Sequence, residues 1–173
     1  MKRWLPLIPL VVLVALGVLF AGYALHHDPK VNPDALVGQP VPTVSLPGLD
    51  GAPARPLRAA LQGPALINVF ASWCAPCAIE HPELMALQAQ GVSIVGIAYK
   101  DDPAATRAFL SRLGDPFQTV LVDRLGDAGV EFGVSGVPET FLVGADGVIF
   151  AKHTGPMTAA DAAEIAARLK AQR

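Results

Sequence analysis

Apolar and polar residues divide the chain into one uncharged N-terminal run and a longer region of short alternating segments. The N-terminal run, Leu5–Leu25, contains no charged residue. Beyond it, continuous apolar runs of strand length alternate with longer stretches in which apolar residues recur every three or four positions. Continuous runs are typical of strands buried on both faces, and the wider spacing is typical of helices. The pattern therefore predicts an α/β domain, a mixed sheet with helices on both faces, after a separate N-terminal helix.

The strands of this domain are predicted from the apolar runs and the turn residues between them. The main runs lie at Ala65–Ala71, Val92–Tyr99, Val120–Val122, Thr140–Val143 and Val148–Ala151. Ala145-Asp146-Gly147 is turn-forming and should join the last two runs into an antiparallel hairpin. Earlier in the chain, Val41–Leu46 followed by Leu49-Asp50-Gly51 predicts a small N-terminal hairpin.

The helices are predicted between these strands. They lie at Ala78–Gln90, Pro103–Leu113, Ala128–Phe132 and Thr158–Lys170, with a short turn or helix at Leu57–Leu61. Asp102 and Thr158 precede two of these segments, and each has a side chain that can accept a hydrogen bond from a free N–H group of the first turn.

The uncharged N-terminal run has the length of a membrane-spanning helix. A helix over Leu5–Leu25 is about 30 Å long, which matches the hydrocarbon thickness of a bilayer. The basic pair Lys2-Arg3 should stay in the cytoplasm, so the rest of a single-pass inner-membrane protein would lie in the periplasm. We therefore expect a membrane anchor at 1–27, a linker at 28–37 and a domain at 38–173.

A cleaved signal peptide is the alternative interpretation of the same run. Gly22-Tyr23-Ala24 offers small residues suited to a cleavage site. An uncleaved anchor is favoured because the apolar run exceeds the usual signal core of about 7–15 residues. Under either interpretation the domain lies in an oxidising compartment. The formal net charge of −2 lacks the basic footprint of nucleic-acid binding, so no nucleic-acid partner is expected.

The candidate chemistry lies at the only two cysteines, Cys74 and Cys77. They follow the run Ala65–Ala71 and precede the predicted helix Ala78–Gln90. A helix N-terminus carries free N–H groups and partial positive charge, which stabilise a thiolate at the first cysteine. Cys74 is therefore the predicted nucleophile, and Cys77, one turn further on, can close a disulfide. Pro76 suits an early helical position, where no N–H partner is needed.

Two other interpretations of a lone CxxC pair remain open, a zinc site and a purely structural disulfide. A structural zinc site needs four ligands, and the histidines do not form a second pair at the required spacing. These histidines are His26, His27, His81 and His153. Redox chemistry is the favoured interpretation, with no metal and no cofactor expected.

The sequence Trp73-Cys74-Ala75-Pro76-Cys77 resembles the active site of thioredoxin. Gly136–Val143 is similar to the segment in which thioredoxin-like proteins carry a cis-proline facing the CxxC pair. Tyr99–Asp102 and Lys152–Pro156 narrow the resemblance to the cytochrome c biogenesis thiol:disulfide interchange proteins, CcmG or DsbE. The resemblance covers about residues 36–173. It implies a thioredoxin-like mixed central sheet flanked by helices, with an N-terminal hairpin extension and a transmembrane helix.

The resemblance also implies roles at the site. Cys74 would be the exposed attacking thiolate, with Trp73 shielding one side of it. Pro138 would be cis and would leave the backbone of Val137 open to pair with an extended substrate segment. Trp73 packed simply in the core is the alternative.

Two further residues, Glu80 and Glu139, are candidates for handling protons, and a third position lacks the acid that the resemblance would suggest. Many thioredoxins carry a buried acid at the position of Asn68, and an amide cannot replace it as a proton acceptor. Glu80 lies one helical turn beyond Cys77, where the family has an acidic residue, although a surface carboxylate that only supports the helix N-terminus is the alternative. Glu139 follows Pro138 and is either a second acid or a partner-recognition residue.

The resemblance implies a periplasmic reductant in cytochrome c maturation. Its substrate would be apocytochrome c or an apocytochrome thiol carrier, because haem attachment at C-x-x-C-H needs reduced thiols. Electrons would come from a transmembrane thiol donor. A broader periplasmic disulfide reductase is the first alternative. A copper metallochaperone using Cys74, Cys77 and a histidine is an alternative from another class.

Overall fold

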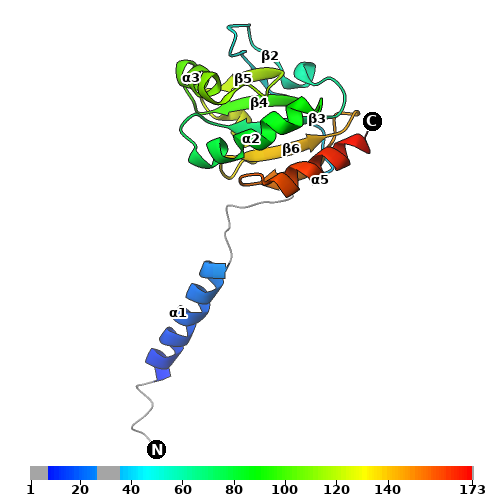
Figure 1. Cartoon of the computed structure of the whole chain (residues 1–173). Helices are drawn as coiled ribbons and strands as arrows, with labels where there is room; N and C mark the ends of the chain where they lie inside the picture. The colour runs from blue at the N-terminus through cyan, green and yellow to red at the C-terminus, as the bar shows by residue number, and fades with distance from the viewer. Residues whose placement is uncertain (1–7, 27–35, 173) are drawn as a thin grey trace, which may run out of the picture. The chain divides into compact units, whose positions relative to one another are not determined.

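The chain forms two units, residues 1–31 and residues 32–173. The structure is a computed structural model that describes residues 8–26 and 36–172 (Figure 1). The first unit contains the described helix α1 (Ile8–His26). The remaining helices and strands all belong to the second unit.

Helix α1 lies inside the segment predicted to anchor the chain in a membrane. Within residues 8–26 and 36–172, no helix is both long enough and apolar enough to cross a bilayer. The predicted transmembrane helix is therefore not confirmed. Residues 1–7 and most of the predicted linker, 28–37, lie outside the described residues.

A five-stranded mixed sheet forms the centre of the second unit, with the strand order β5-β4-β3-β6-β7. Strands β3, β4 and β5 are parallel, whereas β6 runs antiparallel to β3 and β7 antiparallel to β6. Their bounds are β3 (Ala65–Phe70), β4 (Ser93–Tyr99), β5 (Thr119–Asp123), β6 (Glu139–Val143) and β7 (Ile149–Thr154). The predicted mixed sheet is confirmed, and the strand ends differ from the predicted ones by at most three residues.

Helices cover both faces of this sheet. One face carries α2 (Ala75–Ala89), α3 (Pro103–Leu113) and α5 (Ala159–Lys170), and the other carries the short α4 (Asp127–Glu131). Figure 1 shows α2 and α5 lying together over the same face. The two faces have separate apolar cores because alternate residues of each strand point to opposite sides.

The predicted N-terminal hairpin is present, with shorter strands than expected. Strands β1 (Ser45–Leu46) and β2 (Arg55–Pro56) pair antiparallel, and the 3₁₀ turn η2 (Leu57–Ala60) follows them. The connection between β1 and β2 binds the free edge of β5, because the Leu49 N–H donates to the Val120 carbonyl at 2.9 Å. The hairpin thus covers an edge strand that would otherwise present unpaired N–H and C=O groups.

Parallel pairing brings three loops to one edge of the sheet. Strands β3, β4 and β5 all end there, and antiparallel β6 begins there. The segments at this edge therefore include residues 71–74, 100–102 and 124–126, together with 133–138 ahead of β6. The two cysteines lie in the first of these segments and the helix that follows it, so the candidate site is at this edge.

Candidate active site

Cys74 and Cys77 form a disulfide at the start of α2. Cys74 is the N-cap residue, and its Sγ accepts a hydrogen bond from the Cys77 N–H at 3.1 Å. Pro76 lies in the first turn, as predicted. The Cys74 sulfur therefore lies at the positive end of the helix, where a thiolate would be stabilised on reduction.

The expectation that Cys74 is exposed is wrong for this disulfide form. Cys74 is 4% exposed and Cys77 is 2% exposed. The difference has a local cause, because Cys74 is covered on one side by the segment ahead of β6. Its Sγ lies 3.5 Å from the Val137 carbonyl oxygen.

The Val137–Pro138 peptide bond is cis, as the resemblance implied. Val137 is the residue whose backbone was expected to pair with a substrate, and it is the backbone that contacts the Cys74 sulfur. The site thus places a carbonyl group directly beside the sulfur that would form a mixed disulfide. Trp73 directly precedes Cys74 in the chain and is 60% exposed. The alternative that Trp73 packs in the core is therefore wrong. Its indole N–H donates to the Lys100 carbonyl at 3.3 Å.

Glu80 lies on α2 and is completely buried, so the alternative of a surface carboxylate is wrong. Its Oε1 accepts a hydrogen bond from Asn68 Nδ2 at 2.9 Å, and its Oε2 accepts one from the Met157 N–H at 3.0 Å. Asn68 also donates to Thr140 Oγ1 at 3.0 Å. Asn68 on β3 stands where many thioredoxins have a buried acid. In this protein it donates a hydrogen bond to a buried acid on α2, Glu80.

The surroundings of Glu80 favour its protonated form. Burial raises the pKa of Glu80 from the ordinary value of 4.5 to about 7, although hydrogen bonds from Asn68 and Met157 partly offset the rise. A carboxyl group with this pKa can take up and release a proton near neutral pH. Glu80 lies three residues after Cys77 on the same helix, which places both side chains on one side of α2.

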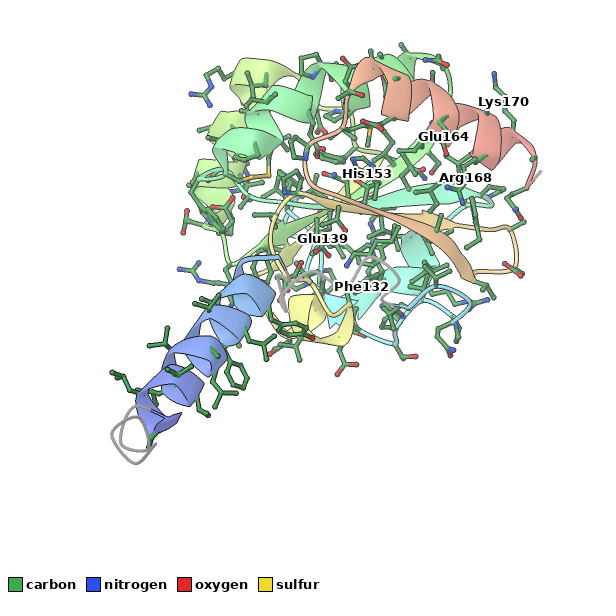
Figure 2. All side chains as sticks on the ribbon, turned by 90° about the horizontal axis from the view of Figure 1, so that it is seen from below. Phe132, Glu139, His153, Glu164, Arg168 and Lys170 are labelled. Carbon is green, nitrogen blue, oxygen red and sulfur yellow. A yellow bond between two sulfur atoms is a disulfide. The ribbon has the colours of Figure 1, made fainter. Side chains whose placement is uncertain are left out.

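Glu139 is the second buried acid, at the start of β6. Its Oε1 accepts hydrogen bonds from the Ser135 N–H at 3.1 Å and the Ser135 hydroxyl at 2.6 Å. Its Oε2 accepts no well-aligned hydrogen bond from the described residues but lies 2.9 Å from Lys152 Nζ, a charge contact between two fully buried side chains. Figure 2 shows Glu139 on the side of the sheet that carries Phe132, away from Glu164 and Arg168 of α5. A carboxylate buried in this way does not reach a partner's surface, so its predicted recognition role is wrong for this conformation.

Sequence reasoning missed several side chains that support the site. Lys152 on β7 was not expected to pair with Glu139. His81 follows Glu80, is 2% exposed, and its Nε2 lies 2.9 Å from the Gly114 carbonyl at the end of α3. The predicted strand ended at Ala151, so no pattern in the sequence indicated that Lys152 lies within β7 with its side chain buried.

Metal binding has no visible support in the part of the chain that the structure describes. Across residues 8–26 and 36–172, no three His, Cys, Asp or Glu side chains are grouped to hold a metal ion. The copper hypothesis therefore gains no third ligand from these residues.

Comparisons with known proteins agree with the site. A family model described as Redoxin matches residues 36–169. The thiol:disulfide interchange protein DsbE of Pseudomonas fluorescens biotype C is 42% identical over 156 residues, covering 90% of this chain and 86% of the relative. The DsbE of Escherichia coli strain K12 is 40% identical over 164 residues, covering 91% and 88%.

A crystal structure of a thiol:disulfide interchange protein described as DsbE, from Chlorobium tepidum, shares the fold. It superposes with a TM-score of 0.68 at 27% identity, covering 79% of this chain and 98% of the other. The thioredoxin-like fold predicted for the domain is thereby confirmed. From these matches and the Cys74–Cys77 disulfide, we conclude that the chain belongs to the DsbE family of thiol:disulfide interchange proteins and is a thiol:disulfide oxidoreductase.

Proposed function

We propose that this protein is a membrane-anchored periplasmic reductant in cytochrome c maturation. It would reduce apocytochrome c, or a thiol carrier for it, before haem is attached. The observation that carries the proposal is the pairing of a CxxC disulfide with a buried acid, Glu80, in a chain of the DsbE family. The segments Tyr99–Asp102 and Gly136–Val143, which resemble the cytochrome c biogenesis proteins, support it.

The exchange proceeds from the reduced dithiol. The Cys74 thiolate attacks one sulfur of the substrate disulfide, which forms a mixed disulfide and releases one substrate thiolate. Cys77 then loses its proton and attacks the Cys74 sulfur, which releases the second substrate thiolate and forms the Cys74–Cys77 disulfide. Two electrons pass from the protein to the substrate, and both substrate thiolates take up protons.

Glu80 suits the second step of this exchange. Cys77 is 2% exposed, so its proton is not readily passed to solvent. A carboxylate one helical turn away, with a pKa of about 7, would accept that proton when Cys77 attacks. Asn68 and the Met157 N–H would hold the carboxylate in place while its charge changes.

The substrate would bind in an extended conformation across Val137. The Val137 carbonyl lies 3.5 Å from the Cys74 sulfur, so a polypeptide that pairs with this backbone would have its cysteine next to Cys74. Exposed Trp73, which precedes Cys74 in the chain, would contact the same substrate.

The location is proposed from the sequence. The uncharged run Leu5–Leu25 and the basic pair Lys2-Arg3 support retention at the inner membrane with the domain in the periplasm. In an oxidising compartment a reductant needs a continuous supply of electrons, which we assign to a transmembrane thiol donor. Protease added to spheroplasts should digest the domain, whereas full protection would contradict this orientation.

The maturation role is tested by deleting the gene and measuring covalently bound haem. We expect c-type haem to be lost while other disulfide-bonded proteins still form, and a small-molecule thiol to restore haem attachment in part. Cys74→Ser should reproduce the loss because no attacking thiolate remains. The matched variant Cys77→Ser should instead accumulate a mixed disulfide with the substrate. Normal c-type cytochrome levels in the deletion strain would favour the broader disulfide reductase.

A further inference from the structure

The turn after β4 is fastened to the segment that precedes the CxxC pair. Asp101 lies in this turn and is 5% exposed. Its carboxylate accepts four hydrogen bonds, from the Ser72 N–H at 2.7 Å, the Ser72 hydroxyl at 2.8 Å, the Asp102 N–H at 2.9 Å and the Thr106 hydroxyl at 2.9 Å. Two of these four bonds therefore go to Ser72, which lies two residues before Cys74.

A second contact joins the same two segments. The Trp73 indole N–H donates to the carbonyl of Lys100, the residue before Asp101. Lys100 has a φ of 47°, in the left-handed region that a lysine rarely adopts, and its N–H donates to the Asp123 carbonyl at 2.7 Å. The backbone of the turn is thus fixed from the β5 side, and its carbonyl and carboxylate both face residues 72–73.

The Asp101 carboxylate also fixes the start of α3. Asp102 is the N-cap of α3, and its side chain accepts a hydrogen bond from the Ala104 N–H at 2.8 Å. Asp101 bonds the Asp102 N–H and, one turn into the helix, the Thr106 hydroxyl. The segment before Cys74 is therefore attached to a helix end as well as to a strand end.

We propose that Asp101 is a positioning residue for disulfide exchange, which holds the Cys74 end of the redox pair against the N-terminus of α2. Cys77 is fixed by its place inside α2. Cys74 is the N-cap, so its position depends on the residues before it, where Ser72 is bonded to Asp101. In the dithiol form no covalent bond joins the two sulfurs, and these hydrogen bonds then keep them close.

This placement determines how readily the disulfide forms. The equilibrium constant for closing a disulfide reflects the effective concentration of one thiol at the other, which falls when one of them moves freely. Asp101 would act on thiol:disulfide exchange at the CxxC pair, the activity shared by the DsbE family. This role does not depend on cytochrome c as the substrate.

A neighbouring aspartate provides a matched control. Asp123 is the last residue of β5, and Asp101 lies just after the end of the neighbouring strand β4. Asp123 is 1% exposed. Its carboxylate accepts hydrogen bonds from the N–H groups of Gly126 and Gly129, both at 2.9 Å, which fix the loop into α4. It is a buried aspartate at the same edge of the sheet, but its side-chain bonds go to α4 and none of those described goes to residues 72–74.

The test measures the thiol:disulfide equilibrium of the full-length protein with glutathione. Asp101→Asn should lower the equilibrium constant for disulfide formation about tenfold, because the neutral amide offers Ser72 one acceptor oxygen instead of two, so one of the two bonds is lost and the other is no longer charge-assisted. A tenfold change corresponds to a potential about 30 mV more oxidising. Asp123→Asn should leave the constant within about twofold of the parent, since its side-chain bonds go to Gly126 and Gly129 and its backbone carbonyl is unchanged. Equal constants for Asp101→Asn and the parent would overturn the proposal.

Loss of the Asp101 charge could shift the equilibrium without any change in position, and Ser72 separates these explanations. Ser72→Ala keeps the carboxylate but removes one of its bonds, so we expect a shift in the same direction of about threefold, with Ser72→Thr close to the parent. No shift in Ser72→Ala would overturn the proposal, and this variant also serves if Asp101→Asn fails to fold.

Alkylation of the reduced protein supplies a second measurement. A Cys74 that is displaced from the helix N-terminus should react more slowly with iodoacetamide at neutral pH in Asp101→Asn, because its thiolate is less stabilised. Faster alkylation would indicate that removal of the negative charge alone acts on the thiol, and it would contradict a positioning role.

Discussion

Among the described residues, each face of the sheet buries one glutamate, and the two have different surroundings. On the face covered by α2 and α5, the hydrogen bonds that Glu80 receives from described residues all come from neutral groups, the Asn68 amide and the Met157 N–H. On the opposite face, Glu139 lies 2.9 Å from the Lys152 ammonium and also accepts two bonds from Ser135. Both side chains are fully buried.

The difference lies in the charge of the groups that contact each buried carboxyl group. Neutral donors do not compensate the full cost of burying a charge, so Glu80 binds a proton near neutral pH. A cation in contact offsets part of that cost, and the contact with Lys152 together with the Ser135 bonds joins β6, β7 and the Ser135 segment into one buried cluster. The segment that this cluster holds leads directly to Val137, beside the Cys74 sulfur.

The largest expected effect follows from breaking the Glu139–Lys152 pair. Lys152→Met should lower the free energy of unfolding by roughly 3–5 kcal/mol, because it leaves a buried carboxylate without its cation. Urea unfolding of the full-length variant and parent measures the change.

The double variant Glu139→Gln with Lys152→Met is the control for this effect. It removes both charges, so it should recover a large part of the stability lost in the single variant. If Lys152→Met alone costs less than about 1 kcal/mol, the pair is not a charge cluster that the fold depends on.

The second effect is the pH dependence that Glu80 imposes on stability. Its pKa is raised on folding, so the native state binds more protons than the unfolded state between pH 4.5 and about 7. The contribution of Glu80 to stability is therefore fully present below pH 4.5 and is lost as the pH rises towards 7. The total is roughly 3.5 kcal/mol, at about 1.4 kcal/mol for each pH unit between the two pKa values.

The measurement compares unfolding of the parent and Glu80→Gln across this pH range, since other groups titrate in both proteins. The difference between them should grow in favour of Glu80→Gln as the pH rises from 4.5 to 7 and stay constant above it. Glu83→Gln, at a partly exposed position on the same helix, is the matched control and should follow the parent. A parent-to-variant difference that is independent of pH would contradict the assigned pKa.

The third effect concerns the rate of resolution by Cys77. The amide of Glu80→Gln cannot accept a proton, so the mixed disulfide should resolve about 10–100-fold more slowly at pH 7. This loss of rate is no larger than the smallest usual contribution of a general base, about 100-fold. The loss should shrink at higher pH, where Cys77 ionises without help. Quenched-flow alkylation of a preformed mixed disulfide measures the rate, and an unchanged rate at pH 7 would remove Glu80 from the reaction.

The order of strands and helices was predictable because apolar spacing is a local property. The run Ala65–Phe70 is buried at every position, which is the pattern of a central strand. Asp102 and Thr158 cap their helices as predicted, since capping needs only residues close in sequence. The helix of the CxxC pair began earlier than expected, at Ala75, because Cys74 itself is the N-cap.

The surroundings of the acids could not be predicted in the same way. Glu80 stands in a helix near its N-terminus, a position that suits a surface carboxylate, and its burial depends on Met157, 77 positions further along the chain. Lys152 is a charge within a strand, and its pairing with Glu139 requires the register of β6 and β7. Such contacts are determined by the packing of distant segments rather than by any local pattern.

The smallest expected effect separates the support of Glu80 from its titration. Thr140→Val removes the hydroxyl that accepts from Asn68 at 3.0 Å, while the Asn68 bond to Glu80 can remain. We expect a loss of about 1 kcal/mol in unfolding free energy, the usual value for one neutral hydrogen bond. The pH dependence attributed to Glu80 should be retained, because its burial and both of its own hydrogen-bond donors are unchanged. If Thr140→Val instead removes that pH dependence, the pKa of Glu80 depends on the whole series of hydrogen bonds from Glu80 through Asn68 to Thr140. The contrast between Glu80 and Glu139 would then come from their hydrogen-bond networks rather than from the groups that contact each carboxyl group directly.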